Sequence, residues 1–119
     1  MARILYIEDN DQNLYLVTFI LEKAGHQVIP ARNGPDGLQL AESGVPDLIL
    51  LDFQLPGMDG LQVLRKLKSC AATGKIPVLA VTSYAMAGDR ERFLASGCDG
   101  YIEKPINPDV FLQQVEAYL

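Results

Sequence analysis

The chain has few of the residues that zinc-binding and disulfide-rich proteins need. Its 119 residues include two cysteines and one histidine. Cys70 and Cys98 lie far apart without metal-ligand spacing, so we expect two reduced thiols rather than a disulfide or a zinc site. His26 falls in a predicted helix-to-strand turn, where we expect an exposed loop residue.

Basic residues and long apolar segments are also scarce. The net charge is −5, the sequence pI is about 4.7, and the longest basic cluster covers only residues 65–68. The first apolar run has four residues before Glu8, which is too short for a signal peptide or a membrane span. We therefore predict a cytoplasmic protein that binds neither nucleic acid nor membranes.

Short apolar runs alternate with amphipathic segments along the whole chain. Hydrophobic residues make up 49% of it, as in folded globular proteins. Strands are predicted near residues 3–8, 27–31, 47–52, 77–81 and 100–103, and helices near 11–24, 35–43, 61–69, 86–96 and 108–119. Connections are short and no linker is evident, so residues 1–119 are predicted to form one domain without an output domain.

The third and fourth predicted strands are apolar on both faces, as buried strands of a parallel sheet require. Strands that alternate with helices favour a parallel sheet, and right-handed crossovers leave few topologies. We predict an α/β fold, a flavodoxin-like (βα)5 three-layer sandwich with a parallel five-stranded sheet in the order 2-1-3-4-5. This order places the first strand beside the third.

Polar side chains suited to phosphate and metal chemistry follow four predicted strands. They are Glu8 and Asp9, Asp52, Thr82 and Lys104. The carboxyl ends of parallel strands meet at one edge, where α/β proteins bind ligands. Each residue alone could be an ordinary solvated, capping or ion-pairing side chain. Together, three carboxylates, a hydroxyl and an ammonium predict a metal-assisted phosphoryl site.

Three neighbouring carboxylates repel one another, and a divalent cation relieves that repulsion. Mg²⁺ prefers oxygen ligands and usually keeps several waters. We expect Asp9 and Asp52 as its side-chain ligands, Glu8 acting through a bound water, and the backbone carbonyl of Gln54 as a further ligand.

A carboxylate can also act as a nucleophile toward phosphorus, and Asp52 is the candidate because it follows the central strand. Mg²⁺ and Lys104 would neutralise charge on the transferring phosphoryl group. Thr82 could donate its hydroxyl to a phosphoryl oxygen.

Four motifs together, in this order and spacing, resemble a response-regulator receiver domain over the whole chain. They are Glu8-Asp9-Asn10, Asp52 with residues 54–60, residues 82–86, and Lys104-Pro105. The resemblance implies that Asp52 accepts a phosphoryl group from a histidine kinase or a histidine phosphotransfer protein. It implies that the acidic pair holds Mg²⁺, that Thr82 is the switch hydroxyl, and that the Lys104-Pro105 peptide bond is cis.

Within the family, residues 85–92 and 97–101 resemble single-domain cell-cycle regulators and the receivers of hybrid histidine kinases. The last helix has no basic residue, unlike the dimerising receivers of winged-helix transcription factors. Gln54 and Tyr84 occupy the two positions that, in the family, tune how fast the phosphoryl group is lost.

The resemblance further implies a two-state switch. Phosphorylation of Asp52 draws Thr82 inward, and Tyr101 then rotates toward the core. The surface formed by the fourth helix, the fifth strand and the last helix changes shape, and a downstream protein reads that change. Output is then a protein–protein contact, unless the chain is a fragment of a larger hybrid kinase or response regulator.

Three other readings compete with a phosphorylated receiver. A flavodoxin-type cofactor binder needs hydroxyl and amide groups after the first strand, where Glu8 and Asp9 would repel phosphate. A phosphatase of the haloacid-dehalogenase class usually has a second Asp where this chain has Gln54. A pseudo-receiver that binds partners without phosphorylation typically lacks an acid, the Thr or the Lys, and all are present here.

Overall fold

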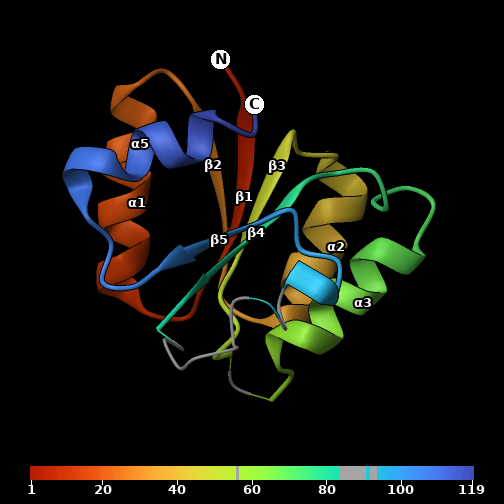
Figure 1. Cartoon of the computed structure of the whole chain (residues 1–119). Helices are drawn as coiled ribbons and strands as arrows, with labels where there is room; N and C mark the ends of the chain where they lie inside the picture. Colours follow the sequence, from red (N-terminus) through yellow and green to blue (C-terminus); the bar gives the residue numbers. More distant parts are fainter. Residues whose placement is uncertain (56, 84–90, 92–93) are drawn as a thin grey trace.

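The computed structural model describes residues 1–55, 57–83, 91 and 94–119. Parallel strands form one sheet with helices on both faces (Figure 1). The elements are β1 (Arg3–Ile7), α1 (Asp11–Lys23), β2 (Gln27–Ala31), α2 (Gly34–Gly44), β3 (Leu48–Leu51), α3 (Gly60–Ser69), β4 (Val78–Thr82), β5 (Gly100–Glu103) and α5 (Pro108–Glu116). The strand order β2-β1-β3-β4-β5 confirms the predicted flavodoxin-like α/β fold.

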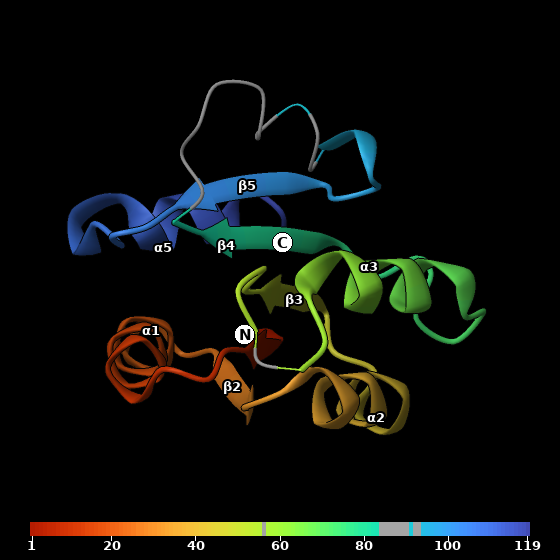
Figure 2. The same cartoon turned by 90° about the horizontal axis from the view of Figure 1, so that it is seen from below.

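Helices α1 and α5 cover one face of the sheet, and α2 and α3 cover the other (Figures 1 and 2). Side chains alternate between the two faces along each strand. Thus Ile4 and Tyr6 of β1 join the apolar cluster under α1 and α5, whereas Leu5 and Ile7 join the cluster under α2 and α3. Strands β3 and β4 are buried on both faces, as their apolar runs predict.

Helices α1, α2, α3 and α5 are each preceded by a capping residue, whose side chain accepts a hydrogen bond from a backbone N–H of the first turn. The capping residues are Asn10, Asn33, Asp59 and Asn107. Asn10 caps α1 directly after Asp9, so the acidic pair lies between the end of β1 and the first turn of α1. Just past the other end of α1, Gly25 adopts a φ of 93°, a left-handed conformation that commonly follows the last turn of a helix.

The described structure differs from the predicted elements near the C-terminus. Helix α5 ends at Glu116 rather than at Leu119, and Tyr118, beyond its end, is 39% exposed. Phe111 and Val115 of α5 are buried. The predicted helix over residues 86–96 falls largely outside the described residues.

The prediction of an exposed His26 is wrong. Its side chain is only 8% exposed, its Nδ1 accepts the Ala2 N–H at 3.0 Å, and its Nε2 lies 2.9 Å from Glu116 Oε2. The cause is topological, because the parallel β1–β2 pair places the residue before β2 next to the start of β1, where α5 also ends. His26 therefore links three segments that are distant in sequence.

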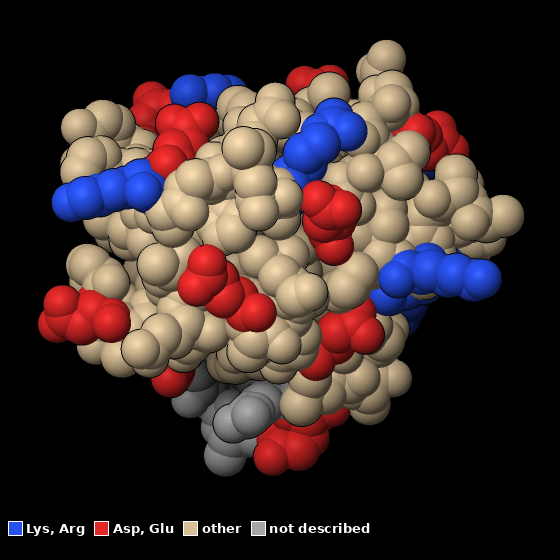
Figure 3. Space-filling model, turned by 90° about the horizontal axis from the view of Figure 1, so that it is seen from above, with Lys and Arg blue, Asp and Glu red and all other residues tan. Residues whose placement is uncertain are grey.

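Charges of both signs are mixed over the face at the amino ends of the strands. Figure 3 shows Lys and Arg side chains there among Asp and Glu side chains. The Lys68 ammonium, for example, lies 3.2 Å from an Asp99 carboxylate oxygen. Among the helices that the structure describes, none is long and apolar enough to span a membrane.

Candidate functional site

The strand register places the predicted site residues along the carboxyl edge of the sheet, which Figure 2 views from below. Ile7 of β1 pairs with Leu51 of β3, and the Asp52 N–H donates to the Ile7 carbonyl at 3.0 Å. The Lys104 N–H donates to the Thr82 carbonyl at 2.9 Å. Residues that follow four different strands thus meet at one edge.

Three carboxylates gather at this edge, as the sequence predicts. Glu8, Asp9 and Asp52 each offer an oxygen, and these oxygens all lie within 4.8 Å of one another. Glu8 is fully buried and Asp52 is 2% exposed, whereas Asp9 is exposed at the rim. This set of hard oxygen donors, of which two are buried and one is exposed to solvent, fits Mg²⁺.

Lys104 places a positive charge next to the two buried carboxylates. Its Nζ lies 2.6 Å from Glu8 Oε1 and 3.3 Å from Asp52 Oδ2, and its side chain is 12% exposed. The cis peptide bond predicted at Lys104-Pro105 is present. The ammonium bridges both buried acids and offsets part of their repulsion.

Sequence reasoning missed two residues that hold Glu8. The Tyr6 hydroxyl donates to Glu8 Oε1 at 2.9 Å, and the Asn13 amide lies 3.3 Å from the same oxygen. The only available signal was spacing, since residues two apart on a strand share a face. Burial and the neighbouring Glu8 raise the pKa of Tyr6, so its phenol remains a proton donor.

Glu8 and Asp52 titrate as a pair. Burial, together with the hydrogen bond to Glu8, raises the pKa of Asp52 to about 7. The hydrogen bond from the Gln54 N–H acts in the opposite direction and lowers this pKa. Burial also disfavours the Glu8 carboxylate, but hydrogen bonds from Asp52 and Lys104 bring the Glu8 pKa below its ordinary value. The metal-free pair therefore takes up one proton as the pH falls through about 7.

Of the remaining predicted residues, Gln54 contacts Asp52 directly, and Thr82 and Tyr101 lie on β4 and β5. The Gln54 N–H donates to Asp52 Oδ1 at 2.9 Å, and Thr82 is fully buried at the end of β4. Tyr101 is half-buried on β5 and packs against the cluster under α2 and α3. Tyr84 lies outside the described residues.

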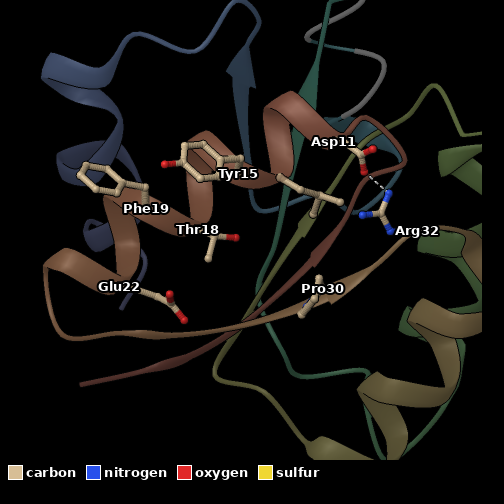
Figure 4. Close-up of a pocket in the computed structure, with 8 residues that line it drawn as sticks. Asp11, Tyr15, Thr18, Phe19, Glu22, Pro30 and Arg32 are labelled. Carbon is tan, nitrogen blue, oxygen red and sulfur yellow. Dashed lines mark hydrogen bonds and ion pairs between the residues drawn. The ribbon is translucent and has the colours of Figure 1, made fainter.

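A separate groove lies between α1 and the edge strand β2 (Figure 4). Tyr15 and Phe19 stack on the outer side of α1 with ring centroids 6.5 Å apart, and Arg32 forms an ion pair with Asp11 at one end of the groove. The groove contains none of the predicted site residues. The groove is therefore a separate feature from the carboxylate cluster at the carboxyl edge.

Comparison with known proteins agrees with the sequence motifs. Residues 4–116 match the family model described as response regulator receiver domain. The chain belongs to the response-regulator receiver family. The polar-differentiation response regulator DivK of Brucella anthropi is 43% identical over 116 residues, covering 98% of this chain and 94% of that protein.

Solved structures show the same architecture. The receiver domain of a sensor histidine kinase from Pseudomonas aeruginosa is 29% identical, with a TM-score of 0.89 over 98% of this chain and 96% of that chain. That structure has a magnesium ion coordinated in its active site cleft. The chemotaxis response regulator CheY4 of Vibrio cholerae is 26% identical, with a TM-score of 0.93 over 100% of this chain and 99% of that chain.

These findings confirm the predicted family and the resemblance of this chain to DivK and to the receivers of histidine kinases. The chain is a receiver of two-component signalling, a class of proteins that partners with histidine kinases. It is not a conventional enzyme. The cluster of Glu8, Asp9 and Asp52 is consistent with the phosphoacceptor site of such a domain.

Proposed function

We propose that this receiver is a phosphorylation-dependent switch in a phosphorelay and that Asp52 is its phosphoacceptor. The observation that carries this proposal is the position of the Asp52 carboxylate. It follows the central strand β3, lies within 4.8 Å of the Glu8 and Asp9 oxygens, and has Lys104 Nζ at 3.3 Å. Asp52 is the only acid of this cluster that follows the central strand and also has both the other carboxylates and the Lys104 ammonium as neighbours.

The donor in this proposal is the phosphohistidine of a histidine kinase or a histidine phosphotransfer protein. An oxygen of Asp52 attacks phosphorus, the phosphorus–nitrogen bond breaks, and the leaving imidazole takes a proton from solvent. Lys104 neutralises negative charge on the phosphoryl oxygens as they arrive. Family membership supports the donor class, and the distances above support the roles of the two side chains.

Mg²⁺ is the cofactor that this donor set fits. Asp9, Asp52 and the Gln54 backbone carbonyl would hold it, and when bound it neutralises charge on the phosphoryl group. Glu8 would act through a water, because its Oε1 already receives bonds from Lys104, Tyr6 and Asn13. The magnesium ion in the Pseudomonas receiver supports the same choice of metal.

Intact mass spectrometry after incubation with acetyl phosphate tests this proposal. We expect the native chain to gain one phosphoryl group in the presence of Mg²⁺ and none in EDTA, and Asp52→Asn to gain none in either. Undiminished labelling of Asp52→Asn would contradict the assignment of the acceptor. A native chain that stays unlabelled both by acetyl phosphate and by a phosphorylated histidine domain would favour a pseudo-receiver.

The proposed switch runs from Asp52 through Thr82 and Tyr101 to the surface formed by β5, α5 and the predicted helix over residues 86–96. A downstream protein would bind this surface. A change from 1:99 to 99:1 requires about 5.5 kcal/mol. Two charge-assisted hydrogen bonds, from Thr82 and Lys104 to the phosphoryl oxygens, contribute roughly 3–6 kcal/mol. Only the upper end of this range supplies the energy for a complete switch, and the lower end corresponds to a partial shift of the population.

Replacing Thr82 by Ala is expected to leave phosphorylation intact and to weaken the response. One of the two bonds that couple the phosphoryl group to the switch is then missing. Amide NMR shifts of Tyr101 and of α5 should change much less on phosphorylation in Thr82→Ala than in the native chain. Thr18→Ala, in the separate groove between α1 and β2, serves as the matched control. Full shifts in phosphorylated Thr82→Ala would exclude this coupling.

A further inference from the structure

Three side chains donate hydrogen bonds to one oxygen of the buried Glu8 carboxylate. The Tyr6 hydroxyl donates to Glu8 Oε1 at 2.9 Å, and the Lys104 ammonium donates to the same oxygen at 2.6 Å. The Asn13 amide adds a longer contact of 3.3 Å. Glu8 is fully buried, so its charge depends on protein donors such as these rather than on bulk water.

Tyr6 and Lys104 differ in how freely they can move. Tyr6 is fully buried in the apolar cluster under α1 and α5, where packing fixes its ring and therefore its hydroxyl. Lys104 carries its ammonium on a flexible aliphatic stem, and this ammonium also lies 3.3 Å from Asp52 Oδ2. The ammonium can therefore turn toward a group on Asp52, whereas the Tyr6 hydroxyl stays with Glu8.

A phosphoryl group on Asp52 changes the demand on Lys104. Its oxygens bring negative charge beside the ammonium, which then has to serve both the phosphoryl group and Glu8. Turning the ammonium toward the phosphoryl oxygens weakens its bond to Glu8, and removing one partner of a buried ion pair is strongly unfavourable unless another donor takes over. The Tyr6 hydroxyl already donates to the same Glu8 oxygen, so this carboxylate remains hydrogen-bonded when the ammonium turns.

We propose that Tyr6 is a positioning residue that holds Glu8 while the Lys104 ammonium turns from Glu8 to the phosphoryl group. This inference rests on the proposed phosphorylation of Asp52. Without the Tyr6 hydroxyl, the ammonium is retained by Glu8 and the phosphoryl group is bound less tightly. We expect an effect of about tenfold, the low end for one hydrogen bond to a charged group, because Asn13 still donates to Glu8.

Binding of beryllofluoride, which mimics a phosphoryl group on an aspartate, tests this inference when it is compared with binding of Mg²⁺ alone. Isothermal titration calorimetry measures both affinities for the native chain and for Tyr6→Phe, with beryllofluoride added at a Mg²⁺ concentration that saturates each protein. In Tyr6→Phe the affinity for beryllofluoride should fall about tenfold more than the affinity for Mg²⁺, because Lys104 leaves Glu8 only when the mimic arrives. Tyr15→Phe removes the same hydroxyl from an exposed tyrosine on α1 and should keep both native affinities.

The two affinities separate positioning from a structural effect. Loss of both by the same factor would show that Tyr6→Phe only loosens the site, and an undiminished affinity for beryllofluoride would show that the hydroxyl is not needed; either result would overturn the inference. In a Lys104→Met background no ammonium moves, so adding Tyr6→Phe should lower the two affinities equally, and a selective loss that persisted there would also overturn it. A native chain that neither binds beryllofluoride nor gains a phosphoryl group from acetyl phosphate would instead overturn the proposed function and this inference together.

Discussion

Replacing Lys104 by Met is expected to lower the free energy of unfolding of the metal-free protein by about 3 kcal/mol at pH 8. Lys104 Nζ is 2.6 Å from Glu8 Oε1 and 3.3 Å from Asp52 Oδ2, and both carboxylates are almost completely buried. Without the ammonium, the two acids repel each other with no adjacent cation to offset their charge. Urea unfolding in EDTA measures the difference.

A matched control comes from an exposed lysine outside the site. Lys75→Met removes the same charge from the surface and should change the unfolding free energy by no more than about 0.5 kcal/mol. The loss in Lys104→Met should shrink at pH 5, where the carboxyl pair can take up protons. Equal stability of the two variants at pH 8 would show that Lys104 does not support the buried acids.

Replacing Asp52 by Asn is expected to stabilise the metal-free protein at pH 8 by about 1–3 kcal/mol. Burial raises the Asp52 pKa from 3.8 to about 7, so the native state binds the extra proton more tightly than the unfolded chain does. Stability of the native chain should therefore fall as the pH rises from about 4 to about 7. One pKa unit corresponds to about 1.4 kcal/mol, and the lowered pKa of Glu8 cancels part of the total.

Thermal unfolding at pH 5 and pH 8 checks this dependence. In EDTA, Asp52→Asn should melt several degrees above the native chain at pH 8 and much closer to it at pH 5. Mg²⁺ should then raise the melting temperature of the native chain far more than that of the variant. Asp109→Asn, at an exposed acid on α5, should show neither effect. A pH-independent difference would refute the raised pKa of Asp52.

The sequence predicted the sheet and the site edge because both depend on strong local signals. Apolar runs such as Leu48–Leu51 can only be buried parallel strands in a chain of this pattern, and the strand order then follows from few allowed crossovers. Once the order is set, Glu8 and Asp52 must be neighbours, because Ile7 pairs with Leu51. Their convergence required no knowledge of side-chain packing.

Contacts that depend on packing between distant segments were not predictable in the same way. Tyr6 reads as a core aromatic on β1, and only the structure shows its hydroxyl donating to Glu8. His26 reads as a turn residue, yet the end of α5 covers it. The hydrogen bond from the Ser83 hydroxyl to Gln54 Oε1 joins residues 29 positions apart, and no periodicity in the sequence indicates it. Each of these depends on tertiary placement rather than on local propensity.

The most direct test of the central claim is to locate the phosphoryl group. The protein is labelled with acetyl phosphate and Mg²⁺, and the acyl phosphate is then reduced with borohydride, which converts a phosphorylated aspartate into homoserine. Peptide mass spectrometry identifies the converted residue. We predict homoserine at position 52 and unchanged residues at Glu8 and Asp9. Conversion at Asp9 or Glu8, with an intact Asp52, would contradict the assignment of Asp52 as the phosphoacceptor.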